Sequence, residues 1–312
     1  MQVELVFTSE GEYARDTHDC QDALELALGA LYNVGSNARL APSGIAAIAS
    51  VLHSFLQRHP DGVIWTLDEL YDETLALLET LPHRRASLED MIDATHPTLL
   101  LIEACSNPHG RLPDYERIAA LKSAQAEFYL VVDNTWLSAA VCNPFRLGAD
   151  LVVTSLTKYY SGGSAIAGAV LGASSALFIN AADWLSLNGQ HVSPYNCARI
   201  LDQLPQLDAR VQASSARTLA LLEALQQRGL RVHHPLAQQR QQAERCFRHV
   251  DGALRVPSVL LIDAPLPSAN LPERTSYGGK EDRIERYDAS VRVALGYESP
   301  LSTDQLLAAL NL

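Results

Sequence analysis

Three short and almost uninterrupted apolar runs constrain the fold of this chain more than any other feature. They span residues 98–103, 128–133 and 151–155 and consist mainly of leucine, isoleucine and valine. A strand that is apolar on both faces is typical of the centre of a parallel sheet, where helices cover both sides. Segments of helical period alternate with such runs between about residues 20 and 190. We therefore expect an α/β fold with a mostly parallel sheet.

Further helices and strands are predicted from the spacing of apolar residues and from the residues that typically begin and end such elements. In the first part of the chain we expect helices over 43–56 and 71–81 and strands over 63–66 and 166–171. A mainly helical stretch over 194–227, interrupted by Pro205, could link two domains. Beyond it we expect strands over 230–234, 259–263 and 290–295 and a closing helix over 303–310. The 312 residues suffice for a large domain, 1–229, and a small C-terminal α+β domain, 230–312.

Composition disfavours several kinds of partner. The formal net charge of -12 argues against nucleic acid and anionic membranes, which select basic patches. No apolar run approaches the length of a membrane span, and the first residues carry an acid where a targeting segment would carry a base. The five cysteines and ten histidines have no spacing typical of a zinc or redox site. We expect a cytoplasmic protein with reduced thiols and no metal.

Lysine is rare in this chain: only Lys122, Lys158 and Lys280 occur among the 24 basic residues. Arginine stays protonated, whereas a desolvated lysine can lose its proton and form an imine. Lys158 follows the third apolar run, and Asp133 ends the second. Charged residues at the carboxyl ends of strands are well placed for a ligand. Taken singly, the aspartate could cap a turn and the lysine could be an ordinary solvated charge.

Together, the lysine and the aspartate fit a site for pyridoxal 5'-phosphate (PLP). PLP needs a lysine that holds it as a Schiff base and a carboxylate that keeps its pyridine nitrogen protonated. Its phosphate needs several hydrogen-bond donors. The hydroxyls of Ser155 and Thr157 supply two, and the backbone amides of the helix expected to begin at Ser43-Gly44 could supply more. The alternative for that last segment is an ordinary helix start.

The order of these residues resembles a known signature. Asp-Asn-Thr-Trp begins at Asp133, Gly-Ala-Asp-Leu-Val-Val-Thr-Ser-Leu-Thr-Lys-Tyr begins at Gly148, and Gly-Gly-Ser begins at Gly162. The pattern is similar to that of the PLP-dependent enzymes of cysteine and methionine metabolism. That family includes cystathionine γ-synthase, the cystathionine lyases, methionine γ-lyase and the O-acyl-homoserine sulfhydrylases. The resemblance implies the fold-type I, aspartate-aminotransferase-like fold, with Lys158 as the Schiff-base lysine.

Four further segments follow the family's order. In the family, a Y-x-R near the N-terminus reaches the phosphate of a neighbouring subunit, and an S-G-M-A-A loop binds phosphate. The tyrosine of Y-G-G-T stacks on the PLP ring and assists proton transfer, and the asparagine of E-S-P-S-N-P lies near the PLP hydroxyl. The corresponding residues here are Tyr13 and Arg15; Ser43, Gly44 and Ile45; Tyr71; and Asn107. The first pair implies a homo-oligomer, a dimer at least and possibly a tetramer, with shared active sites.

Two segments near the C-terminus also resemble the family. Residues 276–281 resemble S-L-G-G-x-E, and residues 291–298 resemble R-x-S-x-G-x-E, whose arginine grips the α-carboxylate of the substrate. The resemblance assigns Ser276 and Arg292 to the substrate. A guanidinium suits that task because it forms two parallel, charge-assisted hydrogen bonds with a carboxylate. The alternatives are that Arg292 is a surface residue on an edge strand and that Arg199 is the clamp.

The chain also departs from the pattern. Asp72 and Glu73 stand where the family has two glycines, and the stretch between Tyr71 and Asn107 looks short, as if one strand were trimmed. The resemblance implies that Lys158, freed by the incoming amino acid, removes its α-proton, and that elimination or replacement follows at Cβ or Cγ of a cysteine- or homoserine-type substrate. Two alternatives stay open: another PLP reaction on an unusual amino acid, and a catalytically degenerate homologue that serves as a subunit or scaffold.

Overall fold

The structure, a computed structural model, describes residues 15, 17–67, 69–85, 88, 96–172, 175–264, 269–274 and 276–312. Within these ranges the larger sheet has seven strands in the order β1-β7-β6-β5-β4-β2-β3. Five of them run parallel: β2 (Val63–Thr66), β3 (His83–Arg85), β4 (Thr98–Glu103), β5 (Phe128–Asp133) and β6 (Leu151–Ser155). The strands β7 (Gly168–Gly172) and β1 (Ala38–Ala41) continue the sheet by antiparallel pairing. The mostly parallel sheet predicted from the apolar runs is confirmed.

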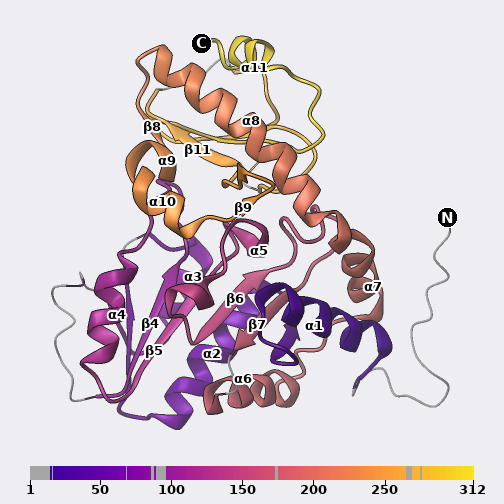
Figure 1. Cartoon of the computed structure of the whole chain (residues 1–312). Coiled ribbons are helices and arrows are strands. Elements are labelled where there is room, and N and C mark those ends of the chain that lie inside the picture. Colours follow the sequence, from indigo (N-terminus) through magenta and orange to yellow (C-terminus); the bar gives the residue numbers. More distant parts are fainter. Residues whose placement is uncertain are drawn as a thin grey trace.

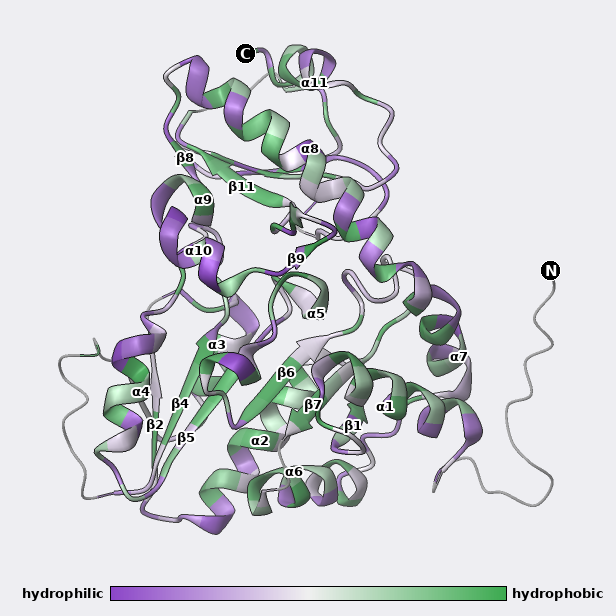
Figure 2. Ribbon diagram, viewed as in Figure 1, coloured by the Kyte–Doolittle hydropathy of each residue, from purple (hydrophilic) through white to green (hydrophobic). Residues whose placement is uncertain are grey.

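The central strands are apolar throughout because helices cover both faces of the sheet (Figures 1 and 2). In β4, Leu99 and Leu101 pack into the core beneath α2 (Gly44–Arg58) and α6 (Ala176–Leu187). Their neighbours on the strand point to the opposite face, as strand geometry requires. There they join the core that includes α1 (Asp19–Tyr32) and α4 (Tyr115–Ser123).

A long helix leads from the larger unit to the smaller one (Figure 1). The helix α7 (Pro194–Gln203) ends in a 3-10 turn that contains Pro205, and α8 (Leu207–Gln227) then contacts β8 and α11 of the smaller unit. A proline in that turn removes an N–H donor, which explains why one helix cannot run through the whole stretch. The predicted interruption at Pro205 therefore separates α7 from α8, the helix that leads into the smaller unit.

The smaller unit is an antiparallel sheet of four strands in the order β12-β13-β11-β8, covered by helices. Its strands are β8 (Val232–His233), β11 (Val259–Ile262), β12 (Arg283–Arg286) and β13 (Val291–Ala294), and it closes with α11 (Thr303–Leu310). This agrees with the α+β character expected beyond residue 230. We propose the boundary at 229/230, although α8 precedes it and packs on the smaller unit.

The remaining short elements lie mainly in the connections. They are α3 (Asp72–Leu78), α5 (Ser138–Val141), α9 (Pro235–Gln238), α10 (Arg240–Cys246), β9 (His249–Val250), β10 (Ala253–Leu254) and the 3-10 helices over Pro144–Leu147 and Leu204–Gln206. Among the described residues, no helix has the length and apolarity needed to cross a lipid bilayer.

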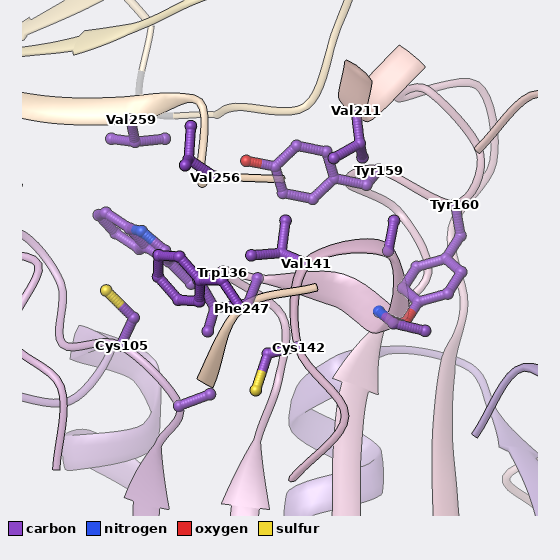
Figure 3. Close-up of a cluster of buried hydrophobic side chains, with 14 of the residues drawn as sticks. Cys105, Trp136, Val141, Cys142, Tyr159, Tyr160, Val211, Phe247, Val256 and Val259 are labelled. Atoms are coloured by element: carbon purple, nitrogen blue, oxygen red, sulfur yellow. Dashed lines mark hydrogen bonds between the residues drawn. The ribbon is translucent and has the colours of Figure 1, made fainter. Parts of the chain in front are cut away.

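The two units share one core, which fixes the smaller unit against the end of the larger sheet. Figure 3 shows Trp136 and Tyr159 of the larger unit facing Val256 and Val259 of the smaller unit. These side chains are all buried and belong to a single apolar cluster. Burying such large side chains contributes roughly 1.5–3 kcal/mol for each. The shared core therefore fixes the position of the smaller unit relative to the larger one, and each unit forms one wall of the space between them.

Candidate active site

A cavity of about 460 Å³ lies between the two units, at the carboxyl ends of β4, β5 and β6. Ligand sites of open α/β sheets occur at this edge. The cavity is lined by ten of the residues that the sequence singled out: Ser43, Gly44, Ile45, Tyr71, Asn107, Asp133, Ser155, Thr157, Lys158 and Arg292. They come from segments far apart in the chain. The structure therefore joins these candidates in one place.

Lys158 lies three residues after the end of β6 and lines the cavity. Burial lowers the pKa of this amine, the positive charge of Arg292 lowers it further, and Glu73 opposes the shift. The alternative of an ordinary solvated charge does not fit this position. A lowered pKa makes the neutral, nucleophilic amine more accessible at physiological pH.

Two carboxyl groups stand side by side at the ends of neighbouring strands. Asp133 on β5 is in register with Glu103 on β4, and burial raises the pKa of both groups. Asp133 Oδ1 accepts the backbone N–H of Thr135 at 2.8 Å, so the aspartate does also cap the turn that follows. Glu103 Oε1 accepts the backbone N–H of Tyr71 at 2.7 Å. A buried carboxylate of raised pKa would be stabilised by a cation beside it.

The first turn of α2 forms a second part of the cavity wall. Ser43 is the N-cap, and its hydroxyl accepts the backbone N–H of Ala46 at 3.2 Å. A Cβ on Gly44 would lie 3.0 Å from Ser155 Cβ, closer than ordinary van der Waals contact, so glycine favours this close approach of the helix start to the end of β6. The first amides of a helix have no partner within the helix. With the hydroxyls of Ser155 and Thr157, they form a wall of donors suited to phosphate.

Arg292 projects from the smaller unit and is 4% exposed. It lies on β13, between β12 and β11, so the alternative of a surface residue on an edge strand is wrong. Its Nη2 lies 2.5 Å from Glu285 Oε2, and its Nη1 donates to Asn107 Oδ1 at 2.9 Å. Arg199 is exposed on α7, pairs with Asp202 at 3.5 Å and does not line the cavity.

Two predicted residues, Ser276 and Arg15, do not line the cavity. The Ser276 hydroxyl accepts a hydrogen bond from Arg283 and does not line the cavity, because only its neighbour Tyr277 turns inward. Arg15 donates to His191 at 3.4 Å, away from this cavity of its own chain. Tyr13 lies outside the described residues. Across the described ranges, no three His, Cys, Asp or Glu side chains gather as metal ligands would.

Sequence reasoning missed three residues that line the cavity on the side of the smaller unit: Tyr277, Glu285 and Tyr287. Tyr277 carried a signal, because it stands at the leucine of the S-L-G-G-x-E pattern. The other two lie on or just after β12, a strand that the sequence did not predict. Since Glu285 is opposite Arg292 in the register of β12 and β13, finding that strand would have found the ion pair.

The fold and this cavity define a class of protein, the fold-type I PLP-dependent enzymes. Cystathionine gamma synthase from Xanthomonas oryzae pv. oryzae superposes with a TM-score of 0.84 at 23% identity, over 97% of this chain and 88% of the other. Apo CalE6, a methionine gamma lyase from Micromonospora echinospora, superposes with a TM-score of 0.85 at 21% identity, over 98% and 92%. These likenesses establish the fold, and the presence of a lysine and an aspartate at the strand ends agrees with it.

The family follows from the sequence match. Residues 7–265 match the family described as Cys/Met metabolism PLP-dependent enzyme, and the chain belongs to this family. Cystathionine gamma-synthase of Escherichia coli is 30% identical over 255 residues, which cover 77% of this chain and 65% of the relative. O-succinylhomoserine sulfhydrylase of Pseudomonas aeruginosa is 30% identical over 228 residues, 64% of this chain and 56% of the relative. The matches thus span less than two thirds of these relatives.

Proposed function

We propose that this chain is a PLP-dependent enzyme that eliminates or replaces a group at Cβ or Cγ of a cysteine- or homoserine-type amino acid. The observation that carries the proposal is the convergence of Lys158, Asp133 and Arg292 on one cavity from three different segments. An amine, a carboxylate and a guanidinium are the groups needed to hold the cofactor and an amino acid together. Membership of the family supports the same chemistry.

The residues present fit PLP. Lys158 would hold the cofactor as an imine, Asp133 would face the ring nitrogen, and the first turn of α2 would hold the phosphate together with Ser155 and Thr157. Tyr71 lines the cavity beside them and would cover the ring. When bound, PLP supplies an electron sink for the negative charge left when the α-proton is removed.

Proton transfer falls to two side chains. A neutral Lys158 amine can take the α-proton onto Nζ, and burial favours that neutral form because it lowers the pKa of the amine. Burial and a hydrogen bond to Glu73 raise the pKa of Tyr71 to about 12, so its hydroxyl stays protonated and can donate to a leaving group. Arg292 would fix the α-carboxylate, which orients the Cα–H bond toward the lysine.

Borohydride reduction and peptide mass mapping test the cofactor assignment. The purified protein should be yellow with PLP, reduction should bleach it, and the pyridoxyl group should be found on Lys158. Two built-in controls exist, because the amine of Lys122 lies 2.6 Å from Asp150 and that of Lys280 lies 2.9 Å from Glu298, both away from the cavity. A label on either control lysine, or none on Lys158, refutes the assignment.

A spectral and product screen tests the substrate. Cysteine, cystathionine, methionine and O-acyl-homoserines should perturb the cofactor spectrum, and at least one should yield a keto acid with ammonia or a replacement product. Turnover confined to an unrelated amino acid would favour a specialised biosynthetic reaction. A yellow protein without turnover of any amino acid would favour a degenerate homologue.

We also propose a homo-oligomer, a dimer at least, in the cytoplasm. Arg15 lies away from the cavity of its own chain, which agrees with a residue that serves the phosphate site of a second copy. All five cysteines are free thiols, as a reducing compartment favours. Analytical ultracentrifugation of the PLP-loaded protein tests the first point, and an active monomer would refute it.

A further inference from the structure

A loop of the smaller unit lies directly on the backbone of the cavity lysine. Gly278 has a φ of +73°, and a Cβ there would stand 2.9 Å from the backbone nitrogen of Tyr159 and 3.0 Å from the carbonyl carbon of Lys158. Only glycine permits both this conformation and this approach. The preceding residue, Tyr277, is thereby placed beside the side chain of the lysine.

The ring of Tyr277 faces the amine. Lys158 Nζ lies 5.2 Å from the ring centroid, within the range of a cation–π interaction. The ring belongs to the cavity wall. The ring and the amine are therefore close enough to interact in the positions that they occupy in the structure.

Two buried aromatic residues hold this ring in place. The Trp136 ring lies 5.3 Å from that of Tyr277 at 50°, and the Tyr159 ring lies 5.8 Å away at 51°. Both supports are about 2% exposed and sit in the core that joins the two units (Figure 3). A ring packed on two sides in this way presents one fixed face to the amine.

Tyr277 differs in side-chain type from the residue in the sequence pattern that this segment resembles. The segment resembles a pattern with leucine at this position, and leucine fills similar space without a π face. A tyrosine here adds an attraction for a cation beside the lysine amine, which gains and loses its charge. Burial and the nearby Arg292 charge work in the opposite direction, since both disfavour the ammonium form.

We propose that Tyr277 is a positioning residue whose ring face holds the ammonium group of Lys158 within the cavity. In the apoprotein the ring keeps the amine directed at the cofactor position. In the catalytic cycle, which rests on the function proposed above, Nζ takes the α-proton and becomes an ammonium. The ring then stabilises that ammonium and keeps it within reach of the substrate. The transfer moves one proton from Cα to Nζ, and no oxidant or further reactant is needed.

Two variants separate the ring face from the hydroxyl and from simple packing. Tyr277→Phe keeps the face, whereas Tyr277→Leu removes it and keeps apolar volume. The chain has only three lysines, so 13C NMR of the lysine Cε carbons in the apoprotein can follow each amine as the pH is varied. Lys122 and Lys280 serve as internal controls in every spectrum.

In the Leu variant the protonation constant of Lys158 should fall about three- to tenfold, the scale of a partly desolvated cation–π contact. In the Phe variant it should stay within about twofold of wild type. An unchanged constant in the Leu variant overturns the proposal, and so does an equal fall in the Phe variant, which would point to the hydroxyl. If the Leu variant fails to fold, Tyr277→Met carries the same expectation, and melting temperatures show which variant is usable.

The PLP-loaded protein gives an independent readout. Exchange of the substrate α-proton in D2O should slow in the Leu variant by a similar factor, with KM nearly unchanged, because the substrate clamp is untouched. A rise in KM without slower exchange would contradict a role at the lysine. Failure of the protein to take up PLP would refute the proposed function, yet the apoprotein titration would still decide the role of Tyr277.

Discussion

The two walls of the cavity differ in how closely they follow the family pattern. The larger unit contributes Asp133, Ser155, Thr157 and Lys158, all at the ends of buried parallel strands and all in the family's order. The smaller unit keeps Arg292 but adds Tyr277, Glu285 and Tyr287. The larger unit departs from the pattern at the opening of the cavity, where Asp72 and Glu73 at the start of α3 replace two glycines. We therefore propose that the larger sheet holds the cofactor and that loops and the smaller sheet select the substrate.

Physical constraints explain this difference. A group at the end of a strand buried on both faces has its position fixed by the strand on each side. In β12 and its following turn only Ile284 packs into the core, whereas Glu285 and Tyr287 line the cavity, so these two can change with little disturbance of the core. Alterations at the strand ends of the larger unit should therefore abolish the reaction, and those on the smaller unit or at Asp72 and Glu73 should change how the substrate is bound or which substrate is used.

Removal of the lysine should have the largest effect. Lys158→Ala deletes both the imine partner and the proposed base, and general acid–base catalysis alone accounts for about 10²–10⁴-fold in rate. We expect kcat to fall by at least about a thousandfold, with PLP retained more weakly and without a reducible imine. Steady-state assays and borohydride trapping check this. Substantial activity in the variant would place the chemistry elsewhere.

Asp133→Asn should have the second largest effect on activity. An amide cannot keep the ring nitrogen protonated, so we expect activity to fall on the order of a hundred- to thousandfold, the scale of removing one preorganised electrostatic partner. Activity assays at matched PLP occupancy check the role, and near-wild-type turnover would contradict it.

Asp133→Asn should also change how the stability of the apoprotein depends on pH. Because burial raises the pKa of Asp133 above its ordinary value of 3.8, the folded apoprotein holds this proton more tightly than the unfolded chain. The group therefore lowers stability as pH rises from 3.8 through the raised pKa. The Asn variant should be as stable as the wild-type apoprotein at low pH and no less stable at neutral pH. Thermal melts across this range would contradict the argument if the variant were weaker throughout.

Substitution of Arg292 tests whether the cavity wall of the smaller unit binds the amino acid. Arg292→Ala should leave the protein yellow and weaken amino-acid binding by about 2–5 kcal/mol, the scale of breaking a buried charged pair. Arg292→Lys should recover little, since an ammonium lacks the planar fork. Spectral titration with the substrate measures both variants. Arg199→Ala is the control and should bind like wild type, because that side chain is exposed and paired with Asp202.

In the larger unit the sequence predicted β2, β4, β5, β6 and β7 but not β1 or β3, and in the smaller unit it predicted β8, β11, β13 and α11 but not β12. The apolar runs predicted β4, β5 and β6 with their observed ends, because strands buried on both faces leave an unbroken pattern. The helix predicted over 71–81 is shorter, α3 (Asp72–Leu78), and β7 begins at Gly168 instead of residue 166. Boundaries depend on hydrogen bonds that a pattern does not record.

The unpredicted strand explains the residues that were missed. β12 (Arg283–Arg286) has the sequence Arg-Ile-Glu-Arg, in which only Ile284 is buried. A four-residue strand with one apolar position carries almost no periodic signal. Its role became visible only through its register with β13, which sets Glu285 against Arg292. The strands that end at Asp133 and Ser155 leave an unbroken apolar pattern in the sequence, whereas the short strand that positions Glu285 does not.

The smallest expected effect concerns the acids at the mouth. Asp72 and Glu73 line the cavity, and both carboxylates influence the Tyr71 hydroxyl, so they lie near the path of a substrate side chain. They are exposed, and water screens their charge. A substrate whose acyl group carries a carboxylate should still be disfavoured relative to one whose acyl group is neutral. The test compares kcat/KM for O-acetylhomoserine, which is neutral at that end, with kcat/KM for O-succinylhomoserine, which carries an extra carboxylate.

The double variant Asp72→Asn, Glu73→Gln removes both charges with little change of shape. It should raise the relative use of the succinyl substrate by about fivefold, the effect of roughly 1 kcal/mol from two screened charges. Use of the acetyl substrate should change little, which serves as the internal control. Glu79→Gln, on an exposed acid at the end of α3 and outside the cavity lining, is the control for net charge. An unchanged ratio in the double variant, or an equal change in the control, would mean that these acids only stabilise the start of α3 and do not select the substrate.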